Sequence, residues 1–274
     1  MPDPATTSVS SIRFKCALVT GASAGLGAEF ARQLAPRCET LALVARRADR
    51  LADLADRLQT RNPGLRVFAI EADLSDPEAR LQAVAHLQEH GLVPDLLINN
   101  AGLGDYGEFA SSEWERIESM LRVNIEALTH LAHAVVPSMV AAGRGSILNV
   151  SSLASVLPIP DFAVYAATKA YVSSFSEALR LEVREHGIHV TALCPGPVRT
   201  EFGEVARRKN GGKDFPARGL LYVPAEQVVA EALEGLSRNR ARVYPGLQIA
   251  VAAAVISLIP LAVLRFGMGF RPRR

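Results

Sequence analysis

The sequence predicts a doubly wound α/β fold, in which helices cover both faces of a parallel β-sheet. Short apolar runs alternate with longer segments of helical period, and runs such as L-A-L-V and L-L-I-N are almost continuously hydrophobic. A strand with such a run is buried on both faces, which is typical of a parallel sheet between two layers of helices. At 274 residues the chain is long enough for one large domain of this class.

The predicted elements follow one another in a regular order. We expect strands at Cys16–Thr20, Thr40–Ala45, Val67–Ala72, Leu96–Asn99, Ser146–Ser151 and His189–Cys194. The helical segments are Glu29–Ala35, Leu51–Leu58, Ala79–Glu89, Glu113–Ala141 and Ala163–Glu185. No linker and no fixed-period repeat divides them, which predicts one α/β domain over residues 14–246. We expect a flexible N-terminus, residues 1–13, before it and an apolar helical extension, residues 247–274, after it.

Composition and charge argue against several classes of protein. The chain has 30 basic and 28 acidic side chains, and a net charge of +2 makes no field that favours nucleic acid as a partner. Asp3 and the lack of an apolar run near it argue against a signal peptide, so we expect a cytoplasmic location. Cys16, Cys38 and Cys194 are widely spaced and the six histidines lack ligand spacing, which predicts neither disulfides nor a metal site.

The stretch V-T-G-A-S-A-G-L-G, residues 19–27, predicts a phosphate-binding turn. Its three glycines, Gly21, Gly25 and Gly27, lie between a predicted strand and a predicted helix. At such a turn the backbone can approach a pyrophosphate, whose charge is stabilised by the unpaired N–H groups of the helix N-terminus. From this motif alone, a strand-to-helix turn that only tolerates glycine is the alternative.

Several motifs together resemble the short-chain dehydrogenase/reductase family, which has a Rossmann-like fold. They are T-G-A-S-A-G-L-G, Asp73, N-N-A-G at Asn99–Gly102, Asn124, Ser152, Tyr165-x-x-x-Lys169 and P-G at Pro195–Gly196. Each motif is weak alone, but their order and spacing over about residues 14–245 are specific in combination. The resemblance implies an oxidoreductase that binds a nicotinamide dinucleotide.

The resemblance also implies a set of cofactor-binding residues. These are Gly21, Ser23, Gly25, Leu26, Gly27, Arg46, Asp73, Leu74, Asn100, Ala101, Gly102, Tyr165, Lys169, Pro195, Gly196, Val198 and Thr200. Asp73 is expected to contact the adenine, and Asn99–Gly102 to line the adenosine pocket and steady the central sheet. For Asn99 and Asn100 the alternative is an ordinary turn at a strand end.

The end of the second predicted strand, L-V-A-R-R, favours NADP(H) over NAD(H). A site for NAD places a carboxylate there to bind the ribose 2′-hydroxyl, whereas a 2′-phosphate requires a cation. This chain has Ala45 followed by Arg46 and Arg47. Arg46 is expected to bind the phosphate, with Ser23 as a further donor, and Arg47 is expected to be solvated. The alternative is that both arginines form the solvated start of a helix.

Tyr165 and Lys169 are four residues apart, so they share one face of a helix. A free tyrosine has a pKa of about 10 and is a poor acid or base near neutral pH unless its phenolate is stabilised. The resemblance implies that Tyr165 protonates a carbonyl oxygen, that Lys169 stabilises the phenolate and holds the nicotinamide ribose, and that Ser152 hydrogen-bonds the oxygen. It also implies that Asn124 holds a water that relays the proton.

Each of these residues also has a purely structural interpretation. Tyr165 alone would be a packing aromatic and Lys169 alone a solvated lysine, but their spacing with Ser152 favours the catalytic set. Ser151 competes for the role of the serine, although adjacent strand residues point to opposite faces. Asn124, within a helix, would otherwise bond its own backbone.

The expected function is an NADP(H)-dependent interconversion of a carbonyl and a secondary alcohol by hydride transfer. The expected substrate is lipophilic: a 3-oxoacyl group, a steroid or another ketone or aldehyde. Residues 196–223 match the position of the family's substrate loop and are expected to close over the substrate. A sugar-nucleotide epimerase is disfavoured because too few residues follow Cys194 for a sugar domain. The alternative is a cofactor-binding regulator or scaffold of the same fold without turnover.

The apolar end of the chain departs from the short end usual in this family. Leu247–Leu264 carries no charge, and as one helix it would extend about 27 Å against a hydrocarbon core of about 30 Å. Three interpretations stay open: packing on the protein's own cleft or subunit interface, a peripheral membrane contact through residues 247–274, and a transmembrane segment. The first two are favoured, and Pro260 would kink the helix. The resemblance also implies a homodimer or homotetramer.

Overall fold

The structure, a computed structural model, describes residues 13–208 and 222–269. Its seven strands form one sheet in the order β3-β2-β1-β4-β5-β6-β7, and every pair of neighbours is parallel. The strands are β1 (Phe14–Thr20), β2 (Cys38–Ala45), β3 (Arg66–Glu71), β4 (Leu96–Asn99), β5 (Gly145–Val150), β6 (Ile188–Leu193) and β7 (Arg242–Val243). From β1 the strand order runs to one side through β2 and β3, and β4 then begins the other side, so the order reverses between β1 and β4. The carboxyl ends of the strands at such a topological switch point form a crevice for ligands. The predicted doubly wound parallel sheet is confirmed.

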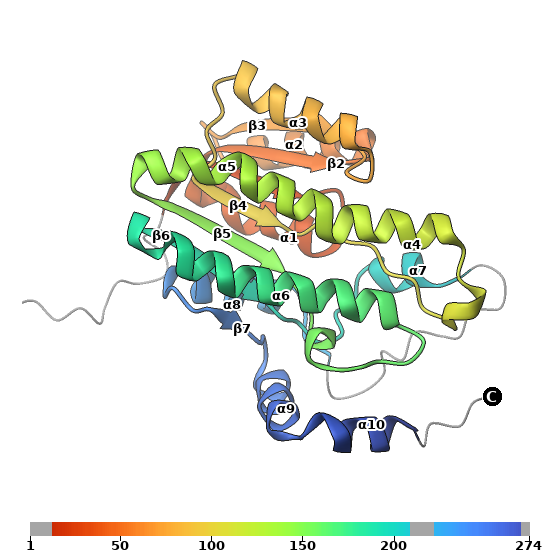
Figure 1. Ribbon diagram of the computed structural model, residues 1–274. Coiled ribbons are helices and arrows are strands. Elements are labelled where there is room, and N and C mark those ends of the chain that lie inside the picture. The colour runs from red at the N-terminus through yellow and green to blue at the C-terminus, as the bar shows by residue number, and fades with distance from the viewer. Residues whose placement is uncertain (1–12, 209–221, 270–274) are drawn as a thin grey trace, which may run out of the picture.

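Helices cover both faces of the sheet. They are α1 (Gly25–Leu34), α2 (Ala48–Arg61), α3 (Pro77–Glu89), α4 (Trp114–Leu121), α5 (Leu128–Ala142), α6 (Ala163–Val183), α7 (Phe202–Ala206), α8 (Ala225–Ser237), α9 (Leu247–Leu258) and α10 (Leu261–Gly269). Buried residues of α1, α2 and α8 form one apolar cluster with the sheet, and those of α3, α5 and α6 form another. In Figure 1, α5 and α6 cross in front of the strands, and α1 and α8 lie behind them.

Short 3-10 turns complete the path of the chain. They are η2 (Ala35–Arg37), η3 (Phe109–Ser111), η5 (Leu153–Val156) and η6 (Arg184–His186). Of these, η5 matters most for the site because it follows β5 directly at the carboxyl edge of the sheet.

The sequence patterns predicted the first helix but not the last strand. The helix begins at Gly25, inside the glycine turn, where the turn motif placed its start. The last strand, β7, has only two residues and no periodicity by which it could be found.

The segment predicted as one helix over Glu113–Ala141 contains a wider turn. A π-helical stretch, η4 (Arg122–Ala127), joins α4 to α5. Such single turns of π-helix are frequent at functional sites, and this one carries Asn124. By length and composition the combined helix Trp114–Ala142 is able to cross a membrane, but its α5 part contributes to the core beneath the sheet.

The apolar run expected as a single helix over Leu247–Leu264 is two helices. The pair α9 and α10 is bent by 107° at the break between them. Ile259 is extended there, with φ −82° and ψ 123°. A residue before proline is disfavoured in the helical region, so Pro260 forces the break rather than a mild kink.

Candidate active site

A cavity of about 1050 Å³ opens at the carboxyl ends of the strands, as expected at the topological switch point between β1 and β4. It runs from the glycine turn after β1 to the start of α6. The predicted site residues that line it are Gly21, Ser23, Gly25, Leu26, Arg46, Asp73, Leu74, Asn100, Ala101, Gly102, Ser152, Tyr165, Lys169, Pro195, Gly196, Val198 and Thr200. Gly27 and Asn124 do not line it, and their places are described below.

The glycine turn is built so that side chains are excluded from it. Gly21 and Gly25 have φ values of +65° and +54°, in the left-handed region that favours glycine. A Cβ at Gly21 would lie 2.8 Å from the amide nitrogen of Asn100, and a Cβ at Gly27 would collide with the backbone oxygen of Gly21. Gly27 therefore lets α1 approach the turn closely, and the turn stays open as a cradle at the N-terminus of that helix.

Thr20, which the sequence analysis did not single out, ties two strand ends together. Its Oγ1 donates to the oxygen of Ile98 at 3.3 Å and accepts from the backbone nitrogens of Asn100 and Ala101 at 2.9 and 3.0 Å. The amide of Asn100 donates back to the oxygen of Thr20 at 2.8 Å. These bonds hold the N-N-A-G segment against the glycine turn. The signal that the sequence offered was its place at the start of the T-G-A-S-A-G-L-G motif, directly before Gly21.

At the end of β2 the two arginines differ in their contacts. Arg47 donates to Ser23 Oγ from Nε and Nη2 at 3.2 and 3.1 Å, and to Glu201 from Nη1 at 2.7 Å. Arg47 is therefore bonded as well as partly solvated, with its side chain 40% exposed, because the fold brings Ser23 and the start of α7 to this strand end. Arg46 lies 3.8 Å from Asp73, with both side chains about half exposed. Ala45 leaves no carboxylate at the position that would bind a ribose 2′-hydroxyl.

Glu201 is a further residue that the sequence did not indicate. Its second oxygen accepts a hydrogen bond from Arg50 at 2.6 Å. The hydrogen bonds from Arg47 and then Arg50 hold the pKa of Glu201 below its ordinary value, so the carboxylate is charged at neutral pH. The chain leading into α7 is thereby fastened to the start of α2.

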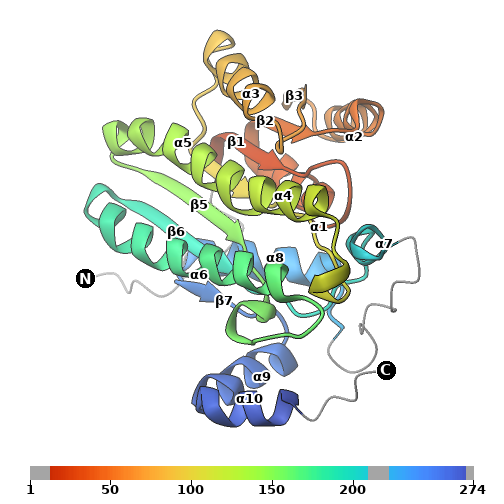
Figure 2. The same cartoon turned by 45° about the vertical axis from the view of Figure 1, so that its right-hand side comes forward.

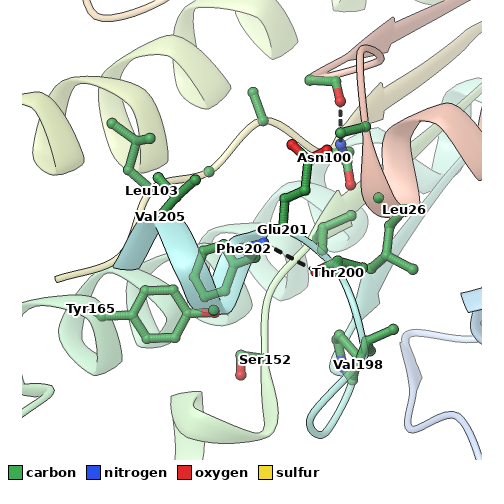
Figure 3. A pocket seen from close by; sticks show the side chains of 18 of the residues that line it. Leu26, Asn100, Leu103, Ser152, Tyr165, Val198, Thr200, Glu201, Phe202 and Val205 are labelled. Carbon is green, nitrogen blue, oxygen red and sulfur yellow. Dashed lines mark hydrogen bonds between the residues drawn. The ribbon is translucent and has the colours of Figure 1, made fainter. Parts of the chain in front are cut away.

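Tyr165 lies at the inner end of the cavity, beside Ser152 (Figure 3). Its ring stacks on Phe162 with centroids 4.1 Å apart. Burial raises the pKa of Tyr165 to about 12, against the opposing effect of its hydrogen bond with Ser152. The phenol is therefore protonated at neutral pH.

Lys169 lies one helical turn after Tyr165 and is buried. Its Nζ donates to the oxygen of Val150 at 2.8 Å and lies 5.6 Å from the centre of the Tyr165 ring. Burial lowers the pKa of Lys169 to about 8. The structure thus brings Tyr165, Lys169 and Ser152 together, from α6 and from the end of β5.

The two neighbouring serines have different surroundings. Ser151 is buried, and its Oγ donates to the oxygen of Lys169 at 2.8 Å and lies 2.8 Å from Ser173 Oγ. Ser152 lines the cavity and accepts from the backbone nitrogen of Ala154 at 3.1 Å. Ser151 also borders the cavity, but it is 2% exposed and its hydroxyl is bonded to α6, so Ser152 is the more accessible of the two serines.

Asn124 lies behind the cavity, almost completely buried. Its Oδ1 accepts from the nitrogen of Leu103 at 2.8 Å, and its Nδ2 donates to the oxygen of Leu103 at 2.9 Å and to Thr168 Oγ1 at 3.0 Å. The side chain therefore bonds to a neighbouring loop and to α6 rather than to its own helix. It positions the loop that follows β4, and its side chain does not line the cavity.

Apolar side chains form a large part of the cavity wall, and Leu103, Tyr106, Ile159, Phe162 and Phe202 cluster with Tyr165. We call this part of the cavity the apolar hollow; its lining is Leu103, Tyr106, Leu153, Leu157, Ile159, Phe162, Phe202 and Val205. Figure 3 shows Phe202 and Val205, from α7, facing the same hollow as Tyr165. Of the loop predicted over residues 196–223, residues 209–221 lie outside the described part of the chain.

The short chain dehydrogenase family matches residues 15–211, most of the chain. This chain belongs to the short-chain dehydrogenase family. A solved short-chain dehydrogenase from Sphingobium yanoikuyae, in complex with NADPH, is 35% identical, with a TM-score of 0.78 over 95% of this chain and 97% of that one. The predicted family and enzyme class are confirmed.

Two further short-chain dehydrogenase relatives have named substrates. The bulky-bulky ketone specific alcohol dehydrogenase from Comamonas testosteroni is 31% identical, with a TM-score of 0.75 over 95% of each chain. The sulfoacetaldehyde reductase of Chromohalobacter salexigens is 34% identical over 255 residues, which cover 88% of this chain and 97% of that protein. Relatives of this chain therefore act on both bulky ketones and a small charged aldehyde.

Proposed function

We propose that this protein is an NADP(H)-dependent oxidoreductase that interconverts a lipophilic ketone or aldehyde and its alcohol. The main observation behind the proposal is that Ser152, Tyr165 and Lys169 line one cavity together with the glycine turn and the apolar hollow. Such a cavity is where a hydride carrier and a carbonyl substrate would be brought into contact.

The residues present fit NADP(H). The cradle at Gly21 and Gly27 is closed to side chains and open to a pyrophosphate. At the far end of β2, Arg46, Arg47 and Ser23 supply two cations and a hydroxyl, and Ala45 supplies no carboxylate. Arginines form bidentate, charge-assisted hydrogen bonds with phosphate, so this donor set favours a 2′-phosphate. The solved relative with NADPH supports the same assignment.

Bound NADPH supplies the hydride. On reduction, Tyr165 donates its phenolic proton to the substrate oxygen as the carbonyl carbon accepts the hydride, so the product is the alcohol. Ser152 donates a hydrogen bond to the same oxygen and holds it near the phenol. Lys169 favours the phenolate left behind through its nearby charge, because opposite charges within a few ångströms favour ionisation. For oxidation of the alcohol the same steps run in reverse.

The substrate class follows from the walls of the hollow. Its aromatic and aliphatic lining favours substrates that bury apolar groups on the far side of the carbonyl, and each buried methylene contributes about 0.8 kcal/mol. The bulky ketone relative supports this class. The runner-up is a short anionic aldehyde, because Arg199 and Arg207 also line the cavity and a related reductase acts on sulfoacetaldehyde.

The test is NADPH oxidation over a graded panel: ketones of increasing chain length, a ketone with bulky groups on both sides, and sulfoacetaldehyde. We expect kcat/KM to rise by about fourfold at most for each buried methylene and to be lowest for sulfoacetaldehyde. A Leu157→Asp variant should lose activity on long ketones more than on short ones. Highest activity on sulfoacetaldehyde would favour the runner-up, and NADPH binding without turnover of any carbonyl would favour a regulator or scaffold.

We also propose that the enzyme is a homodimer or homotetramer. On α6, Tyr171 and Leu181 are partly or largely exposed, and Tyr171 stacks on Phe175 with centroids 5.9 Å apart. An apolar helix face of this kind suits an interface between copies. Light scattering at micromolar concentration should give a dimer or larger species, and a monomer alone would contradict the proposal.

A further inference from the structure

The two C-terminal helices expose more aliphatic surface than any other part of the described chain. On α9, Leu247, Val251, Val255 and Leu258 are between 53% and 84% exposed, and on α10 Leu261 and Val263 are 51% and 57% exposed. Contiguous apolar surface of this kind marks a site of association. Figures 1 and 2 show the two helices together at one end of the molecule, below the loop between β5 and α6.

The orientation of α9 is fixed by its inner face. Ile249 and Ala253 are buried, and Ile249 belongs to the core cluster against which Leu153 of η5 packs. Residues two positions away on a helix point to the opposite side, so Val251 and Val255 face away from the protein. Packing of Ile249 and Ala253 on the protein therefore turns the exposed residues of α9 toward the outside. We call these residues, Leu247, Val251, Val255 and Leu258, the apolar stripe.

The bend decides how such a pair can meet a lipid bilayer. At 1.5 Å per residue, the 12 residues of α9 extend about 18 Å and the nine of α10 about 14 Å. Neither reaches across a hydrocarbon core of about 30 Å, and a bend of 107° prevents them from adding up to one span. Two short apolar helices held at such an angle suit the plane of the interface instead.

The charge of this region favours a lipid surface over a second copy of this chain as the binding partner of α9 and α10. Residues 247–274 contain four arginines, Arg265, Arg271, Arg273 and Arg274, and no acidic residue. Arg265, on α10, is exposed beside the apolar stripe. Two such ends facing each other across a symmetry axis would repel, whereas anionic lipid headgroups attract basic residues next to an apolar anchor.

We propose that α9 and α10 dock on the surface of a bilayer that contains anionic phospholipid, with their aliphatic side chains inserted below the headgroups and Arg265 at headgroup level. The contact is peripheral, and no helix of the pair crosses the bilayer. Because α9 packs on η5, and Leu153 of η5 lines the cavity, the apolar hollow lies on the side of the molecule that faces the lipid. A substrate dissolved in the bilayer would reach the site over a short path.

The test is flotation of the full-length protein with two kinds of vesicle: phosphatidylcholine alone, and phosphatidylcholine with 30% phosphatidylglycerol, roughly the anionic share that makes electrostatic attraction measurable. We expect binding to the anionic vesicles and several-fold weaker binding to the neutral ones. The double variant Leu258→Glu/Leu261→Glu should lower the partition coefficient on anionic vesicles by about tenfold or more. Both positions are exposed, so the variant should keep its fold.

The matched control is Leu81→Glu, which places the same charge on α3, where Leu81 is 53% exposed. It should leave vesicle binding unchanged, and circular dichroism should show that all variants are folded. Equal loss in the control and the double variant would overturn the proposal. So would failure of the parent protein to float, or sedimentation showing that the double variant only dissociates an oligomer. The readout needs no substrate, so it is independent of the proposed reaction.

Discussion

Arg208 and Asp105 form a two-armed ion pair: Nε donates to Oδ1 at 2.9 Å and Nη2 to Oδ2 at 2.7 Å. The Asp105 side chain is only 3% exposed and also accepts from Arg116 and Ser112. The pair joins the end of α7 to the loop that follows β4. Since α7 carries Phe202 and Val205 into the cavity, this pair positions one wall of the apolar hollow.

Asp105→Asn should loosen that wall. Removing one charge from a buried pair leaves the other without compensation, which costs about 3 kcal/mol of unfolding free energy. We expect a lower melting temperature and a several-fold higher KM for the carbonyl substrate, with a smaller change in kcat. The control is Asp53→Asn, which removes an exposed pair with Arg57 and should change stability by about 0.5 kcal/mol or less. An unchanged KM would show that the pair has no part in positioning the wall.

The same pair predicts a dependence of stability on pH. Burial alone would raise the pKa of Asp105, but its hydrogen bond with Arg208 and the charge of that arginine hold the pKa below the ordinary value of 3.8. A carboxyl group with a lowered pKa stabilises the folded state above its unfolded pKa, and that contribution is lost as the pH falls through the folded pKa. The difference in unfolding free energy between the parent and Asp105→Asn should therefore be full at pH 6 and shrink below about pH 4. Denaturant titrations at both pH values measure it, and a difference that stays constant would contradict it.

Tyr165→Phe should abolish turnover with little change in NADPH affinity, because the substitution removes the proton donor and keeps the ring that stacks on Phe162. Steady-state kinetics and fluorescence titration with NADPH measure the two effects separately. The control is Tyr171→Phe, which removes a hydroxyl on the outside of the same helix, bonded to Thr129 at 2.9 Å. Turnover of Tyr165→Phe within about tenfold of the parent would refute the general-acid role, for which 10²- to 10⁴-fold is typical.

Arg46→Asp should reverse the choice of cofactor. A carboxylate at this position repels a 2′-phosphate and accepts a hydrogen bond from a ribose 2′-hydroxyl. We expect the ratio of kcat/KM for NADPH to that for NADH to fall by about tenfold or more. Arg47→Ala, measured beside it, shows how much of the preference depends on the arginine bonded to Ser23. Equal kcat/KM values of the parent enzyme for NADPH and NADH would contradict the assignment of NADP(H).

Gly27→Ala should damage the cradle even though glycine-to-alanine changes usually favour a helix. The new Cβ would collide with the backbone oxygen of Gly21, which cannot move without distorting the turn. We expect a loss of NADPH affinity and of about 2 kcal/mol or more of stability, the usual range for overpacking. Gly267→Ala is the matched control: it lies in α10 with nothing within 4 Å of the added Cβ, so it should be neutral or slightly stabilising. Calorimetric titration with NADPH compares the two, and equal affinities would contradict the expectation.

The sequence by itself determined the sheet, its parallel strands and the positions of the glycine turn and of Tyr165 and Lys169. These features depend on local patterns: apolar runs with strand spacing, glycines with fixed offsets, and two residues four apart on one helix. Each pattern is written in consecutive residues, so it can be read without knowing which distant segments meet.

Tertiary structure alone decided the contacts between distant segments. Thr20 with Asn100, Arg47 with Glu201, and Asp105 with Arg208 are 80, 154 and 103 residues apart. No periodicity encodes such pairs, since they arise only where the carboxyl ends of different strands meet at one edge of the sheet. The same holds for the C-terminal run: its composition predicts an apolar helix, but the break before Pro260 and the packing of Ile249 on the core decide which side chains face outward.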